Sequence, residues 1–284
     1  MTRNLSESDI PKESPRAILF QFVIFPLGVV LIGVGIFFLF GRLATDRQTV
    51  SDYLNEVRSG GRHERWQAAY QLSQLIHAGK AKEVPHLYED VSAAYAESKN
   101  DDPRIRRYLS MVLGNLGDRR ATSQLVDGLK DADTETRIYA ALALGRLHDP
   151  ASVPALLNAF ATDEHDVRKA AAYALGEIGD PRALPALTTA LQDQTPDVRY
   201  NAAIAVARMG DTRAIGVVRE MLDRQRLAQV TGMREEQKEL TILSAIPALM
   251  KIAPEEAPKV LAPLAASDPS MRVRSAAKEA LTSR

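Results

Sequence analysis

Histidines that stand next to an acidic residue are the groups in this sequence best suited to metal chemistry. Among the five histidines, His63 precedes Glu64 and His165 follows Glu164. The remaining three show no metal-ligand spacing to one another: His77, His86 and His148. A centre with two metal ions needs more ligands than one His-Glu pair supplies. We therefore expect no metal site and no cofactor, and we interpret His165 as part of a solvated helix start.

The sequence lacks the other common signatures of catalysis. It contains no cysteine, which excludes a thiol nucleophile, a disulfide framework and a cysteine-ligated metal. We find no Gly-rich phosphate loop after a strand and no Ser/His/Asp constellation. The 36 basic and 36 acidic residues cancel, so no basic excess is left to hold phosphates. These features argue against an enzyme, against a small-molecule substrate and against nucleic acid as the main partner.

Three residue types recur every 31 residues, and this period indicates stacked structural units. The series are Arg106, Arg137, Arg168 and Arg199; Asp118, Asp149, Asp180 and Asp211; and Gly114, Gly145 and Gly176, with Ala207 at the next glycine position. Apolar residues at helical spacing surround each arginine, and another apolar helix follows. One unit is therefore a pair of helices.

Local residues predict where the arginine-bearing helix of each pair begins and ends. Four residues before each arginine stands a candidate N-cap, namely Asp102, Asp133, Glu164 or Thr195. The Gly-Asp pairs at 117–118, 179–180 and 210–211 predict left-handed helix ends. From residue 47 onward we expect about seven such pairs in one elongated all-α domain over residues 42–284.

The segment "DVRKAAAYALGEIGDPRALPALTTAL" resembles the HEAT repeat in its bacterial form, the PBS-lyase HEAT-like repeat. The likeness is specific over residues 99–222 and thins on either side, where Arg65 and Arg274 align with the arginine series. It implies an α-solenoid in which the second helix of each pair, the one that bears the arginine, lines the concave face. It also implies that the arginines and aspartates link adjacent units and cap helices, although a phosphate-binding ladder is the alternative.

Some proteins with this repeat are enzymes. Deoxyhypusine hydroxylases place His-Glu pairs in several repeats to hold two irons, whereas this chain has only His63 and Glu64 in such an arrangement. Phycobilin lyases give the repeat its name, but nothing in this sequence marks a tetrapyrrole site. We therefore expect no enzymatic activity, and a phycobilin-lyase-like function remains a less favoured alternative.

The repeat period predicts which side chains of the second helices pack and which face outward. Counted from each arginine, offsets 3, 4, 6, 7 and 10 are nearly always apolar, whereas offsets 1, 2, 5 and 9 vary. Offsets 1, 5 and 9 are spaced by four and therefore lie on one stripe of the helix. Trp, Tyr and Arg are enriched where binding energy concentrates. The stripe therefore predicts a protein- or peptide-docking groove; its candidate residues are Trp66, Tyr70, Arg107, Tyr108, Tyr139, Arg146, Lys169, Tyr173, Tyr200 and Arg208. The alternative is that the aromatic rings only fill space between repeats.

One interruption breaks the period. About 12 extra residues precede the diverged copy near Ile242, around residues 223–238, and this copy lacks the arginine. The insertion either contributes to binding or lengthens two solvated helices.

An uncharged apolar run extends from Ala17 to Phe40. At about 1.5 Å per residue it is long enough to span the ~30 Å hydrocarbon core. We predict a polar disordered tail at 1–15 and a single transmembrane helix at 16–41. The stretch after it resembles bacterial membrane-anchored HEAT-repeat proteins, which implies the inner membrane. Basic residues flank both ends about equally, so the periplasmic side is only weakly favoured for the solenoid.

Together these features predict a membrane-anchored scaffold or adaptor that binds another protein or peptide on the concave face. The alternative is a regulatory or assembly subunit of a membrane enzyme or transporter.

Overall fold

The computed structural model describes residues 24–44, 49–80, 84–161 and 164–283. The chain divides into two units, and the boundary along the sequence lies between residues 49 and 50. In the first unit, α2 spans Phe25–Ala44, and its described side chains are exposed, with Phe25 at 61% and Phe37 at 74%. Among the described residues, no helix combines the length and apolar character that a membrane crossing requires. The predicted tail at 1–15 and residues 16–23 of the predicted transmembrane helix lie outside the described part.

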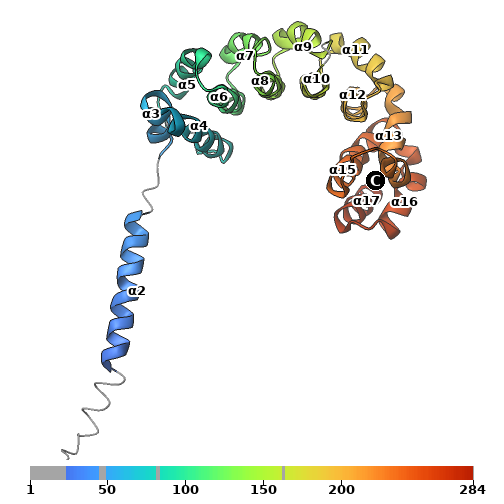
Figure 1. Ribbon diagram of the computed structural model, residues 1–284. Coiled ribbons are helices and arrows are strands. Elements are labelled where there is room, and N and C mark those ends of the chain that lie inside the picture. The colour runs from blue at the N-terminus through green and yellow to red at the C-terminus, as the bar shows by residue number, and fades with distance from the viewer. Residues whose placement is uncertain (1–23, 45–48, 81–83, 162–163, 284) are drawn as a thin grey trace, which may run out of the picture. The chain divides into compact units, whose positions relative to one another are not determined.

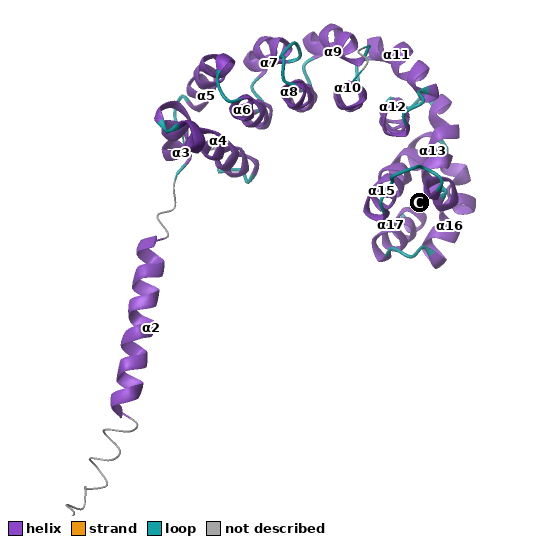
Figure 2. Cartoon of the chain, in the orientation of Figure 1, coloured by secondary structure: helices purple, strands orange, loops and turns teal. Residues whose placement is uncertain are grey.

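The second unit is a stack of helix pairs, and the described residues contain no strand (Figures 1 and 2). Its helices are α3 (Val50–Ser59), α4 (Arg62–His77), α5 (Leu87–Glu97), α6 (Pro103–Leu116), α7 (Thr122–Gly128), α8 (Thr134–Leu147), α9 (Val153–Phe160), α10 (His165–Ile178), α11 (Leu184–Thr189), α12 (Pro196–Arg208), α13 (Ile215–Leu222), α14 (Arg224–Ala228), α15 (Glu235–Ile252), α16 (Ala257–Ser267) and α17 (Met271–Thr282). Seven pairs result, as predicted, with α14 as an extra helix. In Figure 1 this unit forms an arc, with α4, α6, α8, α10 and α12 on its inner side.

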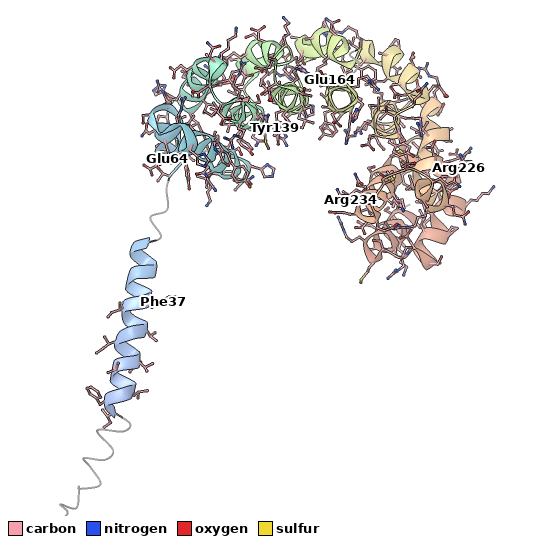
Figure 3. The ribbon with its side chains drawn as sticks, in the orientation of Figure 1. Phe37, Glu64, Tyr139, Glu164, Arg226 and Arg234 are labelled. Atoms are coloured by element: carbon pink, nitrogen blue, oxygen red, sulfur yellow. The ribbon has the colours of Figure 1, made fainter. Side chains whose placement is uncertain are left out.

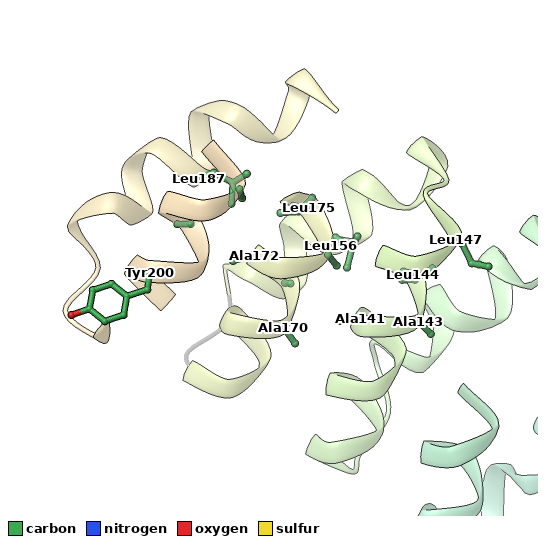
Figure 4. Packing of buried hydrophobic residues seen from close by; sticks show 14 of the residues in the cluster. Ala141, Ala143, Leu144, Leu147, Leu156, Ala170, Ala172, Leu175, Leu187 and Tyr200 are labelled. Carbon is green, nitrogen blue, oxygen red and sulfur yellow. The ribbon is translucent and has the colours of Figure 1, made fainter. Parts of the chain in front are cut away.

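The core lies between the inner and outer helices of the stack and repeats with the same period. Leu144 and Leu175 of the inner helices and Leu156 and Leu187 of the outer helices are fully buried (Figure 4). The predicted packing offsets are buried in each regular repeat, apart from the partly exposed residues at offset 10 of three repeats. Each unit buries its apolar faces mainly against its neighbours, which makes the stack quasi-one-dimensional.

The glycine series allows consecutive inner helices to approach closely. A Cβ atom on Gly114 would lie 2.8 Å from Cα of Ala143, and one on Gly145 would lie 2.9 Å from Cα of Ala174. Gly176 meets α12 in the same way. Any larger residue at these positions would force the backbones apart.

The predicted helix ends are present, with one addition. Gly117, Gly179 and Gly210 have φ values of 70°, 68° and 80°, in the left-handed region. At the equivalent point after α8, His148 takes this conformation with φ 47°, which a residue with a Cβ atom rarely does. The histidine ring compensates in part, because its Nδ1 lies 2.8 Å from the carbonyl oxygen of Glu177.

The predicted N-caps are only half correct. Asp102 and Asp133 accept hydrogen bonds from the backbone N–H groups of their own helices. Glu164 and Thr195 also precede their helices but make no such bond. Their side chains accept hydrogen bonds from Arg137 and Arg168 instead, and so they join neighbouring units.

Most arginines of the series tie an inner helix to the loop before the next inner helix, whereas Arg199 pairs with Glu220 of the outer helix α13. Nη1 of Arg106 lies 2.8 Å from Oδ2 of Asp131, and Arg168 contacts Asp193 in the same way. Arg65 pairs with Asp101. Because their charges meet these carboxylates, the arginines serve the linking role that the resemblance implied, in preference to a phosphate-binding ladder.

The aspartate series caps the outer side of each pair. Asp180 accepts a hydrogen bond from the backbone of Arg182, and the guanidinium of Arg182 holds the same carboxylate. Asp118 and Asp211 repeat this arrangement, whereas Asp149 accepts from the Thr122 hydroxyl at 2.6 Å. The hydrogen bond from Arg182 lowers the pKa of Asp180 to about 2.

In the interrupted repeat, an arginine from outside the 31-residue series replaces the missing one. Ile242 occupies the arginine position of α15 and is fully buried. Arg224 of the inserted helix α14 supplies the missing guanidinium, with Nε 2.6 Å from Oδ2 and Nη2 2.8 Å from Oδ1 of Asp268. The side chain of Asp268 has no exposed surface. The insertion therefore forms an extra helix and lengthens α15, and it anchors the last repeat.

Candidate docking surface on the inner helices

The predicted stripe lies along the inner helices of the arc, and Figure 3 shows Tyr139 on that inner side. Its aromatic residues form a row of touching rings. The ring centroids of Tyr70 and Tyr108 are 5.2 Å apart, and those of Tyr108 and Tyr139 are 6.2 Å apart, both in edge-to-face geometry. The row links α4, α6 and α8 in one continuous aromatic surface. Tyr70 is 39% exposed, so the row is accessible at that end.

Trp66 lies one helical turn before Tyr70 on α4 and extends the same surface. The guanidinium of Arg104 stacks 4.2 Å from its ring centroid, and the ring of His63 contacts it edge-on at 6.0 Å. Its Nε1 is buried without a hydrogen-bond partner. Trp66 is therefore partly covered by its neighbours, and the space-filling alternative accounts for part of its packing.

Two of the four cations of the stripe are held by carboxylates on the next inner helix or just before it, and Arg208 pairs with a carboxylate of the preceding inner helix. Arg107 binds Asp133 through Nε at 2.8 Å and Nη2 at 2.6 Å, and Lys169 lies 3.0 Å from Asp197. The hydrogen bond from Arg107 is the main cause that lowers the pKa of Asp133 to about 2. These pairs fix long side chains in place along the surface.

Arg146 differs from the other cations of the stripe. It is exposed on α8, and no ion pair or hydrogen bond to it is found among the described residues. The equivalent position on α10 is Glu177, which pairs with Arg208 of α12. Arg146 thus offers an uncompensated positive charge on the inner face.

Tyr173 continues the surface on α10. Its ring is 36% exposed, and the guanidinium of Arg208 lies 5.9 Å from the ring centroid. Burial and the nearby carboxylate of Glu177 raise the pKa of Tyr173. The ring is therefore neutral at physiological pH and able to contact an apolar group.

Tyr200 does not fit the prediction of an exposed binding residue. Only 4% of it is exposed, and its hydroxyl donates a 2.8 Å hydrogen bond to Oε1 of Glu220 on α13. Burial raises the pKa of this tyrosine, and Glu220 adds to the effect. Tyr200 is oriented toward the outer helix because α13 supplies a carboxylate acceptor there.

A cavity of about 450 Å3 opens where the regular stripe meets the lengthened α15. Predicted residues on one side are Lys169, Tyr173, Tyr200 and Arg208; the other side consists of residues that the stripe analysis missed, including Met233, Gln237, Leu240, Thr241 and Ser244. The break in the 31-residue period was the one sequence signal for this contribution. The insertion at 223–238 therefore helps to shape the surface.

The histidines do not form a metal centre in the described part of the chain. No group of three or more His, Cys, Asp or Glu residues lies close enough there to hold an ion. His165 begins α10 and lies 3.3 Å from Asp166, with most of both side chains exposed.

Comparison with known proteins identifies the repeats. The sequence matches the family described as HEAT repeats over residues 91–175 and 156–236, which together cover about half of the chain. The chain belongs to the HEAT-repeat family. None of the curated proteins matches the sequence.

Among solved structures, several chains show similarity to this one. The complex of CpcE and CpcF of phycocyanin lyase from Nostoc sp. PCC7120 contains a chain that is 20% identical, with a TM-score of 0.55 over 82% of this chain and 94% of that one. An engineered protein has 20% identity and a TM-score of 0.46, over 70% of this chain and 96% of its own. Human deoxyhypusine hydroxylase in complex with glycerol has 19% identity and a TM-score of 0.35, over 85% and 97%. At these identities only the phycocyanin lyase chain supports a conclusion, and it concerns the fold.

Proposed function

We propose that this HEAT-repeat protein is a scaffold or adaptor that binds a segment of another protein along the inner face of its solenoid. The contacting row of Tyr70, Tyr108 and Tyr139 is the observation that carries the proposal. Rings of this kind bury a large area at low entropic cost and keep a polar atom for a hydrogen bond. The similar phycocyanin lyase structure is itself a complex of two proteins, which is compatible with this role.

We place the scaffold at the bacterial inner membrane, with the solenoid on the periplasmic side. Support comes from the uncharged run Ala17–Phe40 and from the exposed apolar side chains of α2. A tether of this kind raises the effective concentration of the inner surface near other membrane components. Reporter fusions at the C-terminus test the side, since a periplasm-specific reporter should be active and a cytoplasm-specific one inactive.

We also propose that the protein has no catalytic activity of its own. The likeness to a phycocyanin lyase chain rests on 20% identity, and fold does not imply function. Incubation of the purified protein with phycocyanobilin and apo-phycocyanin tests the lyase alternative. Transfer of the pigment would contradict our proposal.

The decisive experiment removes the aromatic surface and measures partner capture. In the triple variant Trp66→Ala, Tyr139→Ala and Tyr173→Ala, crosslinking in intact cells should no longer recover the partners of the wild-type protein. Tyr88→Ala is the matched control, because Tyr88 lies on outer helix α5 beneath Arg120. Helical circular dichroism must be unchanged in both variants. Undiminished capture by the triple variant would exclude the inner face as the docking surface.

The alternative role is that of an assembly subunit of a membrane enzyme or transporter, in which α2 packs against partner helices. The exposure of Phe37 at 74% favours a helix that contacts an apolar environment or another helix. Replacing residues 17–40 with an unrelated apolar helix separates the two roles. A scaffold should retain its partners after this exchange, whereas an assembly subunit should lose them.

A further inference from the structure

The cavity beside α15 opens where the glycine series ends. Up to α12, glycines at 31-residue spacing let neighbouring inner helices approach closely. At the next position the residue is Ala207, which is fully buried. Residues of α12 and α15 line the cavity, so it lies at the first inner-helix pair without a glycine of the series.

The lining of this cavity has a defined chemistry. Ile204, Met221, Met233 and Leu240 provide apolar surface, and Leu240 is 50% exposed. Methionines adapt their shape to an inserted group more easily than branched residues do. Polar groups of α12 and α15 surround this apolar surface, which is the arrangement of a pocket that holds one apolar side chain and orients its backbone.

The cavity is continuous with the inner surface, because Tyr173 belongs to both. One inner helix earlier lies Arg146, the exposed cation for which no ion pair is found among the described residues. A bound segment that fills the cavity and follows the row of tyrosines must pass this charge. An acidic residue in that segment would complement Arg146.

We propose that the cavity receives one large apolar side chain of the bound segment, and that Arg146 pairs with an aspartate or glutamate of the same segment. Arg146 lies on α8, and the cavity opens between α12 and α15, two to three inner helices further along the stack. Packed helices lie about 8–10 Å apart and an extended chain advances about 3.3 Å per residue, so the two residues stand about five to nine positions apart. This inference rests on the proposed docking function and specifies the chemistry of the partner.

A random dodecapeptide phage library, panned against the full-length protein in lipid nanodiscs, tests the inference. The selected peptides should be enriched in a large apolar residue with Asp or Glu about five to nine positions away. Panning on Leu240→Asp should lose the apolar enrichment. Panning on Arg146→Glu should replace the acidic residue with Lys or Arg. Matched controls are Met271→Asp, at a residue 77% exposed on α17, and Lys259→Glu on α16, which should select the wild-type motif.

Binding of one selected peptide, labelled with fluorescein, gives the quantitative readout. We expect Kd to rise about tenfold or more for Leu240→Asp and for Arg146→Glu, as loss of a contact in a binding centre implies. A peptide with Lys in place of its acidic residue should recover affinity for Arg146→Glu.

The possible failures are distinguishable. If the wild-type protein selects no peptide, both the docking function and this inference are overturned. If peptides bind and are lost in Tyr108→Ala, but neither Leu240→Asp nor Arg146→Glu changes the selected motif, docking on the inner face stands and this inference is wrong.

Discussion

The regular repeats from α6 to α12 and the last repeats from α13 to α17 reach the same cross-helix bond by different routes. In the regular part, the series arginines of α6, α8 and α10 bind a carboxylate in the loop before the next inner helix, as Arg106 binds Asp131. Arg199 of α12 instead pairs with Glu220 of α13. In the last part, the inner helix has Ile242 at that position and the inserted helix α14 provides Arg224. The bond is retained although its position in the sequence changes. The glycine of the series is not retained, since Ala207 stands at its position, and a cavity lies between α12 and α15.

The largest effect should follow from removal of the substitute arginine. Arg224→Ala leaves the carboxylate of Asp268 buried without its two hydrogen bonds, and loss of a partner in a buried pair costs about 3–5 kcal/mol. We expect faster amide hydrogen exchange in α16 and α17 and a lower urea midpoint for that region. Arg226→Ala is the control, since Arg226 is 66% exposed and lies 3.6 Å from Asp223. Equal effects of the two substitutions would show that the last repeat does not depend on this bond.

The close approach of the regular part is tested next. In Gly145→Ala, the new Cβ atom would meet the backbone of Ala174 at 2.9 Å. Overpacking of this kind costs about 1–3 kcal/mol, even though alanine favours helix. Denaturant unfolding monitored by circular dichroism measures the change. A gain in stability would show that the inner helices can separate without cost. The difference between Gly145 and Ala207 would then have no consequence for packing.

The partly buried bond between Arg107 and Asp133 in the regular part should respond to acid. Because Arg107 lowers the pKa of Asp133 to about 2, the folded state keeps this carboxylate charged where the unfolded state, near 3.8, takes up a proton. The stabilisation is therefore complete above about pH 4 and is lost as the pH falls toward 2. Carboxyl NMR should give a pKa near 2 for Asp133. In Arg107→Gln this pKa should rise toward 3.8, and no rise would mean that another group holds the charge.

The smallest effect is a gain in stability at a glycine without close neighbours. Gly216 lies inside α13, and a Cβ atom there would meet nothing within 4 Å. Gly216→Ala should stabilise the protein by about 0.5–1 kcal/mol, because alanine loses less backbone entropy in a helix. Thermal unfolding measures the shift. Paired with Gly145→Ala, it separates a glycine that packing requires from one that it does not.

Sequence periodicity was sufficient to predict the helix pairs, because leucines at fixed positions such as Leu144 and Leu175 must be buried whatever the neighbours are. It also placed most of the inner stripe. It failed where a tertiary contact decides the orientation of a side chain. Tyr200 is oriented toward the outer helix α13 by its hydrogen bond to Glu220. His148 ends a helix in a left-handed backbone conformation that is rare for its residue type. The bond between Arg224 and Asp268 joins residues 44 positions apart, outside the repeat period, so no local pattern could reveal it.

The constant spacing of the arginine bonds makes the solenoid a molecular ruler. Arg137 and Arg168 occupy equivalent places, so excision of the 31 residues 138–168 would let Arg137 take over the bond to Asp193. Such an excision would remove Tyr139 and Arg146 and bring the cavity one repeat nearer to Tyr70 and Tyr108. The number of repeats between them therefore sets how long a ligand must be to engage both ends.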